Sequence, residues 1–243
     1  MRLAVVFLMT IFSWPSFSQD RSETKELYGT MGGRNALLVL QATQRPDGGW
    51  QVAGEYVLLP TMVRRFVEGE RSPEIGVTSL KEGSSPILFG RPATGELRGT
   101  WRDGKFSGTR FGPAGQERER FELSEEFPSM DAYSGALRCE ANDGAYRSSL
   151  ALTVEAGKIR ALDWRSRVSP SEHSCTLGTL AQQPMKGGLA AAAGKCRVTV
   201  RDLGDFLRVG AENCSAQCGS QAYLEPLLVD RRGECRLLHP VPR

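Results

Sequence analysis

All six cysteines of this 243-residue chain lie in its second half, and the first half contains none. They are Cys139, Cys175, Cys196, Cys214, Cys218 and Cys235. An even number of cysteines confined to one region is typical of a disulfide framework, provided that the protein folds in an oxidising compartment. This distribution predicts that the first half is stabilised by its apolar core alone, and that disulfides stabilise the second half.

The N-terminus indicates the compartment. Residues 1–18 read MRLAVVFLMTIFSWPSFS, in which Arg2 precedes the apolar run 3–12. The run is too short to span a bilayer, and the small residues Ser16 and Ser18 frame a cleavage site. This pattern predicts a signal peptide. We therefore expect an exported protein, periplasmic or secreted, and no transmembrane anchor, because no other long apolar segment follows.

Two other roles for the cysteines are a metal site and a redox pair. Cys214 and Cys218 form the closest pair, and the two histidines, His173 and His239, lie far apart in the sequence. A structural zinc site usually combines close ligand pairs such as two C-x-x-C motifs. A thioredoxin-like redox pair has C-x-x-C at the start of a helix. We therefore expect disulfides, no metal and no cofactor.

The disulfide pairing is not fixed by sequence, but strand order ranks the possibilities. Cys196 begins one hydrophobic run and Cys214 follows the next, so antiparallel pairing would bring these two within bridging distance. The remaining cysteines then predict the bridges 218–235 and 139–175.

The acidic segment 124–131, SEEFPSMD, contains a proline and no periodicity. It marks a linker, for which we expect the bounds 124–132. An N-terminal β-domain is then expected over residues 27–123, after the signal peptide 1–18, and a C-terminal cysteine-containing β-domain over residues 133–238. The formal net charge of +3 is too small to indicate nucleic-acid binding, and no basic run is interleaved with aromatic residues.

Short alternating runs separated by turn residues predict an all-β fold. In WQVAGEYVLL, residues 50–59, alternate positions place Trp50, Val52, Gly54, Tyr56 and Leu58 on one face. The pair Asp103-Gly104 predicts a two-residue hairpin. Glycine stands two residues from an aromatic ring at Gly54, Gly99 and Gly108. We expect rings to pack across bare glycines in a curved sheet, although the same spacing is compatible with a ligand groove.

The second half shows the same pattern. Residues 150, 152 and 154 alternate as Leu-x-Leu-x-Val, and the segment 155–158, EAGK, predicts a hairpin with glycine in the left-handed conformation. The segment 187–194, GGLAAAAG, is interpreted as a loop or strand edge. The chain as a whole is expected to form two small antiparallel β-sheet or β-barrel domains, the second stapled by disulfides.

Residues 27–123 resemble a β-domain of exported Gram-negative proteins. The resemblance rests on Tyr28-Gly-Thr-Met-Gly-Gly, then LLVL, Gly-x-Tyr, Leu-x-Gly-x-Trp, Phe-Ser-Gly and Phe-x-Leu, in an order similar to the family's Y-x-G-x-I-G-G, L-x-G-x-W and F-x-G pattern. It implies a small antiparallel sheet or barrel without catalytic residues. The C-terminal half faintly resembles small disulfide-stapled periplasmic lysozyme inhibitors, through Tyr133-Ser134-Gly135 and the late cysteines, but lacks their downstream tyrosine.

The sequence shows no motif that indicates catalysis. The sequence contains no G-x-S-x-G, H-E-x-x-H, G-x-G-x-x-G or phosphate-binding loop. His173 follows Glu172 and is flanked by Ser171 and Ser174, but adjacent residues of an extended loop point to opposite sides and give no triad geometry. A carboxylate pair for glycan hydrolysis leaves no local motif; the candidates near strands are Glu55, Glu96, Glu140 and Glu155.

We therefore expect an exported, non-enzymatic binding protein of the bacterial envelope, with an unknown envelope protein or glycan as partner and no catalytic residues. A lysozyme-type inhibitor is the first alternative, and a glycan-active enzyme is the second. A carboxylate pair in a cleft would favour the enzyme. A projecting Ser134-Gly135 loop beside an exposed basic residue would favour inhibition.

Overall fold

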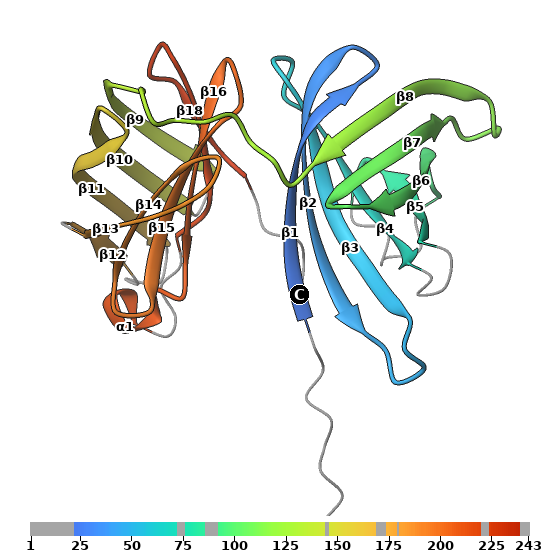
Figure 1. The fold of residues 1–243 in the computed structure, drawn as a ribbon, viewed down its shortest axis with the longest axis horizontal. Coiled ribbons are helices and arrows are strands. Elements are labelled where there is room, and N and C mark those ends of the chain that lie inside the picture. Colours follow the sequence, from blue (N-terminus) through green and yellow to red (C-terminus); the bar gives the residue numbers. More distant parts are fainter. Residues whose placement is uncertain are drawn as a thin grey trace, which may run out of the picture.

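The computed structural model describes residues 22–71, 76–85, 92–143, 146–168, 174–178, 180–219 and 224–238. The strands of the first half close into an eight-stranded antiparallel barrel, in which each strand pairs with the next and β1 pairs with β8. They are β1 (Ser22–Met31), β2 (Arg34–Gln44), β3 (Trp50–Leu58), β4 (Val63–Arg71), β5 (Val77–Gly83), β6 (Gly95–Arg102), β7 (Lys105–Phe111) and β8 (Glu117–Ser124). Figure 1 shows the barrel beside a second body built from the rest of the chain.

The interior of the barrel is filled by side chains. Val52, Tyr56 and Leu58 of β3 belong to the buried interior cluster, and Trp50 packs against it, as the alternation predicted. The tight β6–β7 turn also forms as predicted: Asp103 and Gly104 have positive φ angles of 51° and 72°. The local patterns therefore select both the inward face and the hairpin.

Glycines let the rings fill this interior. A Cβ atom at Gly99 would lie 2.7 Å from Phe106 Cε2 and 2.9 Å from Phe121 Cζ, and Gly108 is the register partner of Gly99 on β7. The two phenylalanine rings also contact each other, with centroids 4.8 Å apart. At Gly99 the predicted packing of a ring across a bare glycine is confirmed.

The second half forms two antiparallel sheets that face each other. The first has the order β12-β11-β10-β9 and the second the order β13-β14-β15-β16-β17-β18. Their bounds are β9 (Gly135–Asp143), β10 (Tyr146–Glu155), β11 (Lys158–Val168), β12 (Ser174–Leu177), β13 (Ala181–Gln183), β14 (Leu189–Ala193), β15 (Cys196–Asp202), β16 (Phe206–Glu212), β17 (Leu227–Asp230) and β18 (Cys235–Leu237), with one short helix, α1 (Ser215–Cys218). The predicted all-β class is confirmed.

Three disulfides hold the second half together, and they use all six cysteines. Cys196 bonds Cys214, as predicted. The predicted bridges 139–175 and 218–235 are wrong: Cys139 of β9 bonds Cys235 of β18, and Cys175 of β12 bonds Cys218 of α1. The reason is the layered arrangement, because the edge strands that meet across the two sheets are remote in sequence. Three disulfides are typical of a protein that folds outside the cytoplasm.

Two further segments are more ordered than their sequences suggest. The alanine-rich segment is strand β14, paired on both sides, so its interpretation as a loop or strand edge is wrong. Small side chains fit there because Ala190 and Ala191 are fully buried. The expected linker contains two buried side chains, Phe127 and Met130, which pack into different clusters. No helix among the described residues is long and apolar enough to cross a membrane.

Candidate functional site

The two facing sheets of the second half form a β-sandwich. This sandwich and the barrel meet in a packed junction. The outer faces of β1, β2 and β3 lie against the outer face of the six-stranded sheet, as Figure 1 shows for β1 and β2 beside β15 and β16. The two bodies share one apolar cluster, which consists of Leu37, Val57, Leu59, Phe127, Leu203, Phe206, Leu228 and Leu238. These residues are 0–9% exposed, so the junction is dry at its centre.

Ion pairs connect the two bodies beside this apolar cluster. Glu26 of β1 pairs with Arg208 of β16 and, at 3.3 Å, with the Nε atom of Arg201 of β15. The Arg201 guanidinium also lies 4.0 Å from the ring centroid of Phe127. Burial and the neighbouring Arg208 lower the pKa of Arg201, although Glu26 opposes the shift. Partners on both bodies therefore fix their relative placement, because ion pairs of buried groups are geometrically demanding.

A groove opens at one side of this junction, and it has two adjoining parts. The first has a volume of about 320 Å³ and the second about 440 Å³. Met62, in the β3–β4 turn, and Arg236, on β18, line both parts. The first part is otherwise lined by Val57, Arg64, Phe66, Ser84, Leu237 and Leu238, and the second by Pro60, Asp205, Phe206, Asp230, Arg231, Arg232 and Glu234. We call this feature the junction groove.

A buried carboxylate lies behind the first part of the groove. Glu55 is 1% exposed, and neither of its oxygens has a hydrogen-bond partner in the part of the chain that the structure describes. Its nearest charge is Arg64, whose Nε atom is 3.5 Å from Glu55 Oε2. Arg64 Nη2 also donates to the Leu237 carbonyl oxygen at 3.1 Å, and so connects the barrel to β18. Burial raises the pKa of Glu55 to about 7, and the charge of Arg64 only partly opposes this shift.

We expect this carboxylate to make the stability of the protein depend on pH. Between the ordinary pKa of 4.5 and the folded-state value of about 7, the folded protein keeps a proton that the unfolded chain has lost. The free energy of unfolding therefore falls as the pH rises through this window, by about 3 kcal/mol. Glu55→Gln should flatten this fall in urea titrations at pH 5 and pH 8.

The matched control for this measurement is Glu155→Gln, in an exposed hairpin, which should leave the pH dependence as it is in the unsubstituted protein. A Glu55→Gln variant that loses as much stability between pH 5 and pH 8 as the unsubstituted protein would contradict the expectation.

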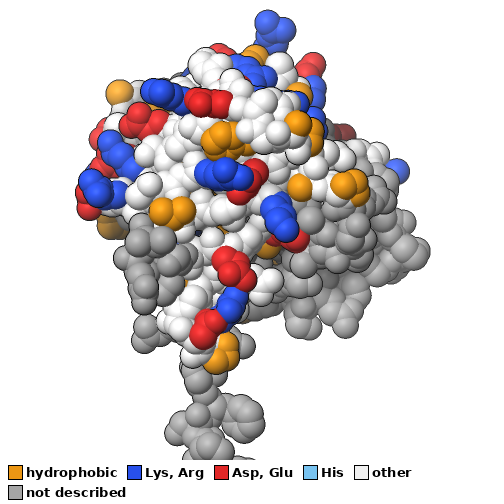
Figure 2. Space-filling model, turned by 90° about the vertical axis from the view of Figure 1, so that its right-hand side faces the viewer, with side chains coloured by type: hydrophobic (Ala, Val, Ile, Leu, Met, Phe, Trp, Pro, Cys, Tyr) orange, Lys and Arg blue, Asp and Glu red, His pale blue; other side chains and the backbone are white. Residues whose placement is uncertain are grey.

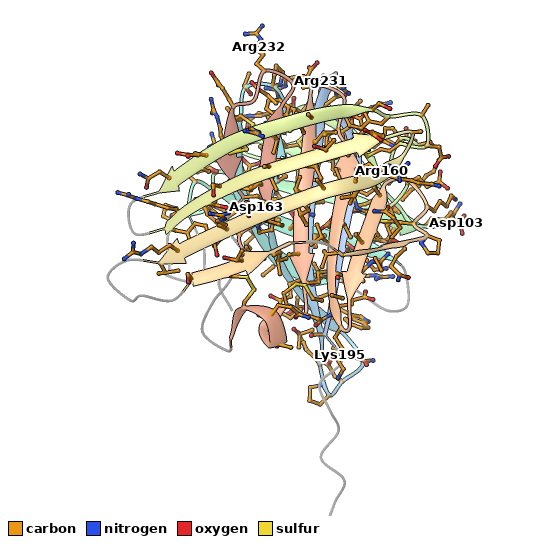
Figure 3. All side chains as sticks on the ribbon, turned by 90° about the vertical axis from the view of Figure 1, so that its left-hand side faces the viewer. Asp103, Arg160, Asp163, Lys195, Arg231 and Arg232 are labelled. Carbon is orange, nitrogen blue, oxygen red and sulfur yellow. A yellow bond between two sulfur atoms is a disulfide. The ribbon has the colours of Figure 1, made fainter. Side chains whose placement is uncertain are left out.

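The outer end of the groove contains basic residues with different roles. Arg231 Nη2 lies 3.1 Å from Asp202 Oδ2, and Arg231 Nε donates to the Gly204 carbonyl oxygen at 2.9 Å. Figure 3 shows Arg232 projecting away from the molecule, whereas Arg231 lies closer to it. Arg236 has no ion pair or side-chain hydrogen bond with the described residues. The guanidinium of Arg231 is therefore already engaged, whereas that of Arg236 is available.

A second polar cluster lies inside the barrel, and its groups form hydrogen bonds with one another. Arg110 donates to Glu82 through Nε at 2.7 Å and Nη2 at 2.8 Å, and to Glu119 through Nη1 at 2.7 Å. Tyr56 donates to Glu82 Oε2 at 2.8 Å. Desolvation alone would raise the pKa of Glu82, but the bonds from Arg110 and Tyr56 outweigh it and hold that pKa below its ordinary value. These bonds connect β3, β5, β7 and β8, so we interpret the cluster as structural.

The face of the barrel seen in Figure 2 shows no dominant charge, because acidic and basic side chains are interleaved across it and apolar side chains are scattered. Arg98, for example, bonds Glu96 on the same strand. Exposed pairs of this kind contribute little to stability or recognition. The junction groove therefore remains the better candidate site.

The carboxylates named from the sequence do not come together. Glu55 is buried beside Arg64, while Glu96 accepts from Ser79 and Arg98 on the outside of the barrel. Glu140 lies on the outer face of the four-stranded sheet, and Glu155 pairs with Arg160 in the β10–β11 hairpin. His173, with Glu172 and Ser171, and His239 lie outside the described residues.

The Ser134-Gly135 segment is held against its own domain. Ser134 Oγ accepts a hydrogen bond from the Ala156 backbone N–H at 2.9 Å, so it is tied to the β10–β11 hairpin. Arg231 lies over the Tyr133 ring, 5.8 Å from its centroid. The basic neighbour is therefore present, but the serine hydroxyl is already engaged within the fold.

No family model, curated protein sequence or solved structure matches this chain. The junction groove therefore has to be interpreted from its own chemistry. Met62, Arg64 and Arg236 were not predicted from the sequence, because they come from a turn and two strands, β4 and β18, that are far apart in the chain. The positive φ of 57° at Met62 is a feature of the backbone that no local sequence signal indicated.

Proposed function

We propose that this chain is an exported, non-enzymatic binding protein whose ligand occupies the junction groove. The observation that supports this is the groove itself, which is lined by two domains that a buried apolar cluster and ion pairs hold in place. Binding sites for small molecules occur preferentially at domain interfaces, and they combine apolar walls with a few polar groups. The first part of the groove has this composition.

The lining also favours binding over chemistry. Around the first part, Met62, Phe66 and Leu237 supply apolar surface, and Arg64 and Arg236 supply charge. A guanidinium stays protonated at any physiological pH, so it donates hydrogen bonds and orients a ligand but does not exchange protons. These side chains are suited to holding a molecule.

The proposal predicts that a small amphiphile binds in the groove of the full chain after the leader. Octanoate, octanamide and octylamine serve as probes, because a volume of about 320 Å³ is at the lower end for ligand pockets. In isothermal titration calorimetry, at least one probe should bind with one molecule per chain. Ser84→Trp, which places a ring on the exposed edge of the groove, should weaken that binding at least tenfold.

The matched control is Ser107→Trp, on an exposed position of β7 away from the groove. It should leave the affinity unchanged. If none of the three probes binds, or if binding survives Ser84→Trp in a variant that circular dichroism shows to be folded, the groove is not the ligand site and the proposal fails.

A further inference from the structure

We infer that the ligand of the junction groove is an amphipathic anion, with a short apolar chain and a carboxylate or phosphate head that Arg236 and Arg64 bind. This inference rests on the proposed function and names the class of ligand. It follows from the placement of two guanidinium groups at an otherwise apolar cavity.

The apolar part of the site is the wall formed by both bodies. Val57 and Phe66 come from neighbouring strands of the barrel, and Leu237 and Leu238 come from the end of β18. Such a wall favours a hydrocarbon or aryl group, because moving it out of water is favourable in proportion to the apolar area that is buried. A wholly polar ligand would leave this wall without a complementary surface.

Arg64 is held in position at the cavity and still has donors to offer. Its Nη2 atom donates to the Leu237 carbonyl oxygen, and its Nε atom lies 3.5 Å from Glu55. A guanidinium carries five N–H donors, so these contacts leave several free. The bond to Leu237 orients this group, and Glu55 is screened from solvent, because it is 1% exposed.

Arg236 supplies the second guanidinium group, and it has more N–H donors free to bind an anion than Arg64 has. It lies on β18 between Cys235, fixed by its disulfide to Cys139, and Leu237, which is buried. Its guanidinium lines the groove without an ion pair to any described residue. Arginine binds carboxylates and phosphates through two parallel hydrogen bonds, which makes it selective for these planar or multi-oxygen anions.

The charges that line the two parts of the groove determine where the head group binds. The described lining of the second part balances three carboxylates, of Asp205, Asp230 and Glu234, against three guanidinium groups, of Arg231, Arg232 and Arg236. The described lining of the first part contains two guanidinium groups, of Arg64 and Arg236, and no carboxylate. An anion is therefore attracted more strongly to the first part, where Arg64, Arg236 and the apolar wall meet, than to the second part. A cationic amphiphile would be repelled from the first part by the same two arginines.

The test compares three probes with the same eight-carbon chain and different heads, together with octyl phosphate, on the full chain after the leader. By calorimetry, octanoate or octyl phosphate should bind at least tenfold more tightly than octanamide and octylamine. The tighter of the two anions identifies the head group. Arg236→Gln should weaken anion binding about tenfold and abolish the preference over octanamide.

Arg160→Gln is the matched control, because Arg160 is an exposed residue of β11 that lines neither part of the groove. It should leave the affinity for anions within twofold. If octanamide binds as tightly as octanoate, or octylamine more tightly, the assignment to an anion is overturned while binding in the groove stands. If Arg236→Gln has no effect on a folded variant, the assignment is overturned as well. If none of the four probes binds, the result instead contradicts the proposed function itself.

Discussion

Replacing Cys139 and Cys235 together by serine is expected to lower the free energy of unfolding by about 4–5 kcal/mol. This bridge connects β9 of one sheet to β18 of the other and spans a sequence separation of 96 residues. A bridge that closes a longer loop removes more conformational freedom from the unfolded chain. Urea denaturation of the double variant measures the loss directly.

The matched comparison is the double replacement of Cys196 and Cys214, whose separation is 18 residues. It should cost about 3 kcal/mol. Because both cysteines are replaced in each variant, no free thiol remains to form a wrong bridge. A smaller loss for the 139–235 variant than for the 196–214 variant would contradict the expectation.

Glu82→Ala is expected to cost about 3–5 kcal/mol, because it removes two of the three hydrogen bonds that Arg110 donates inside the barrel and leaves its guanidinium with Glu119 alone. Glu82 is fully buried, and the Arg110 side chain is only 11% exposed. The Tyr56 hydroxyl loses its acceptor at the same time. Chemical denaturation followed by tryptophan fluorescence gives the change in unfolding free energy.

Glu96→Ala is the control, because its pair with Arg98 is largely exposed and should contribute about 1 kcal/mol or less. The unsubstituted protein should also lose the contribution of Glu82 as the pH falls below the ordinary carboxyl range, since the folded-state pKa is lowered. Similar costs for Glu82→Ala and Glu96→Ala would show that the cluster inside the barrel is not structural.

Local signals predicted the parts of the fold that are local. Alternation in β3 and the Asp103-Gly104 turn depend only on residues adjacent in sequence, and both are confirmed. The β10–β11 hairpin, with positive φ angles at Ala156 and Gly157, belongs to the same group. Each of these features is determined by a backbone preference or a two-residue period, which a single sequence displays.

Features that depend on the stacking of sheets were missed. Strand β14 was not expected because alanine has little strand propensity; burial between two neighbouring strands determines its conformation instead. Two disulfides were assigned wrongly because the sequence does not show which edges meet. Glu55 was named as a possible catalytic carboxylate, and only the structure shows that it lies buried beside Arg64.

The three disulfides are nested in the sequence. The loop closed by Cys196–Cys214 lies within the loop closed by Cys175–Cys218, and both lie within the loop closed by Cys139–Cys235. Each inner bridge shortens the path that the next one must close, which lowers the entropic cost of that closure. The loop-closure entropy lost during oxidative folding is therefore smallest when the innermost bridge forms first and the outermost last. A mispaired inner thiol would obstruct every later step. The β-sandwich should need a thiol-disulfide isomerase to mature efficiently, whereas the cysteine-free barrel should not.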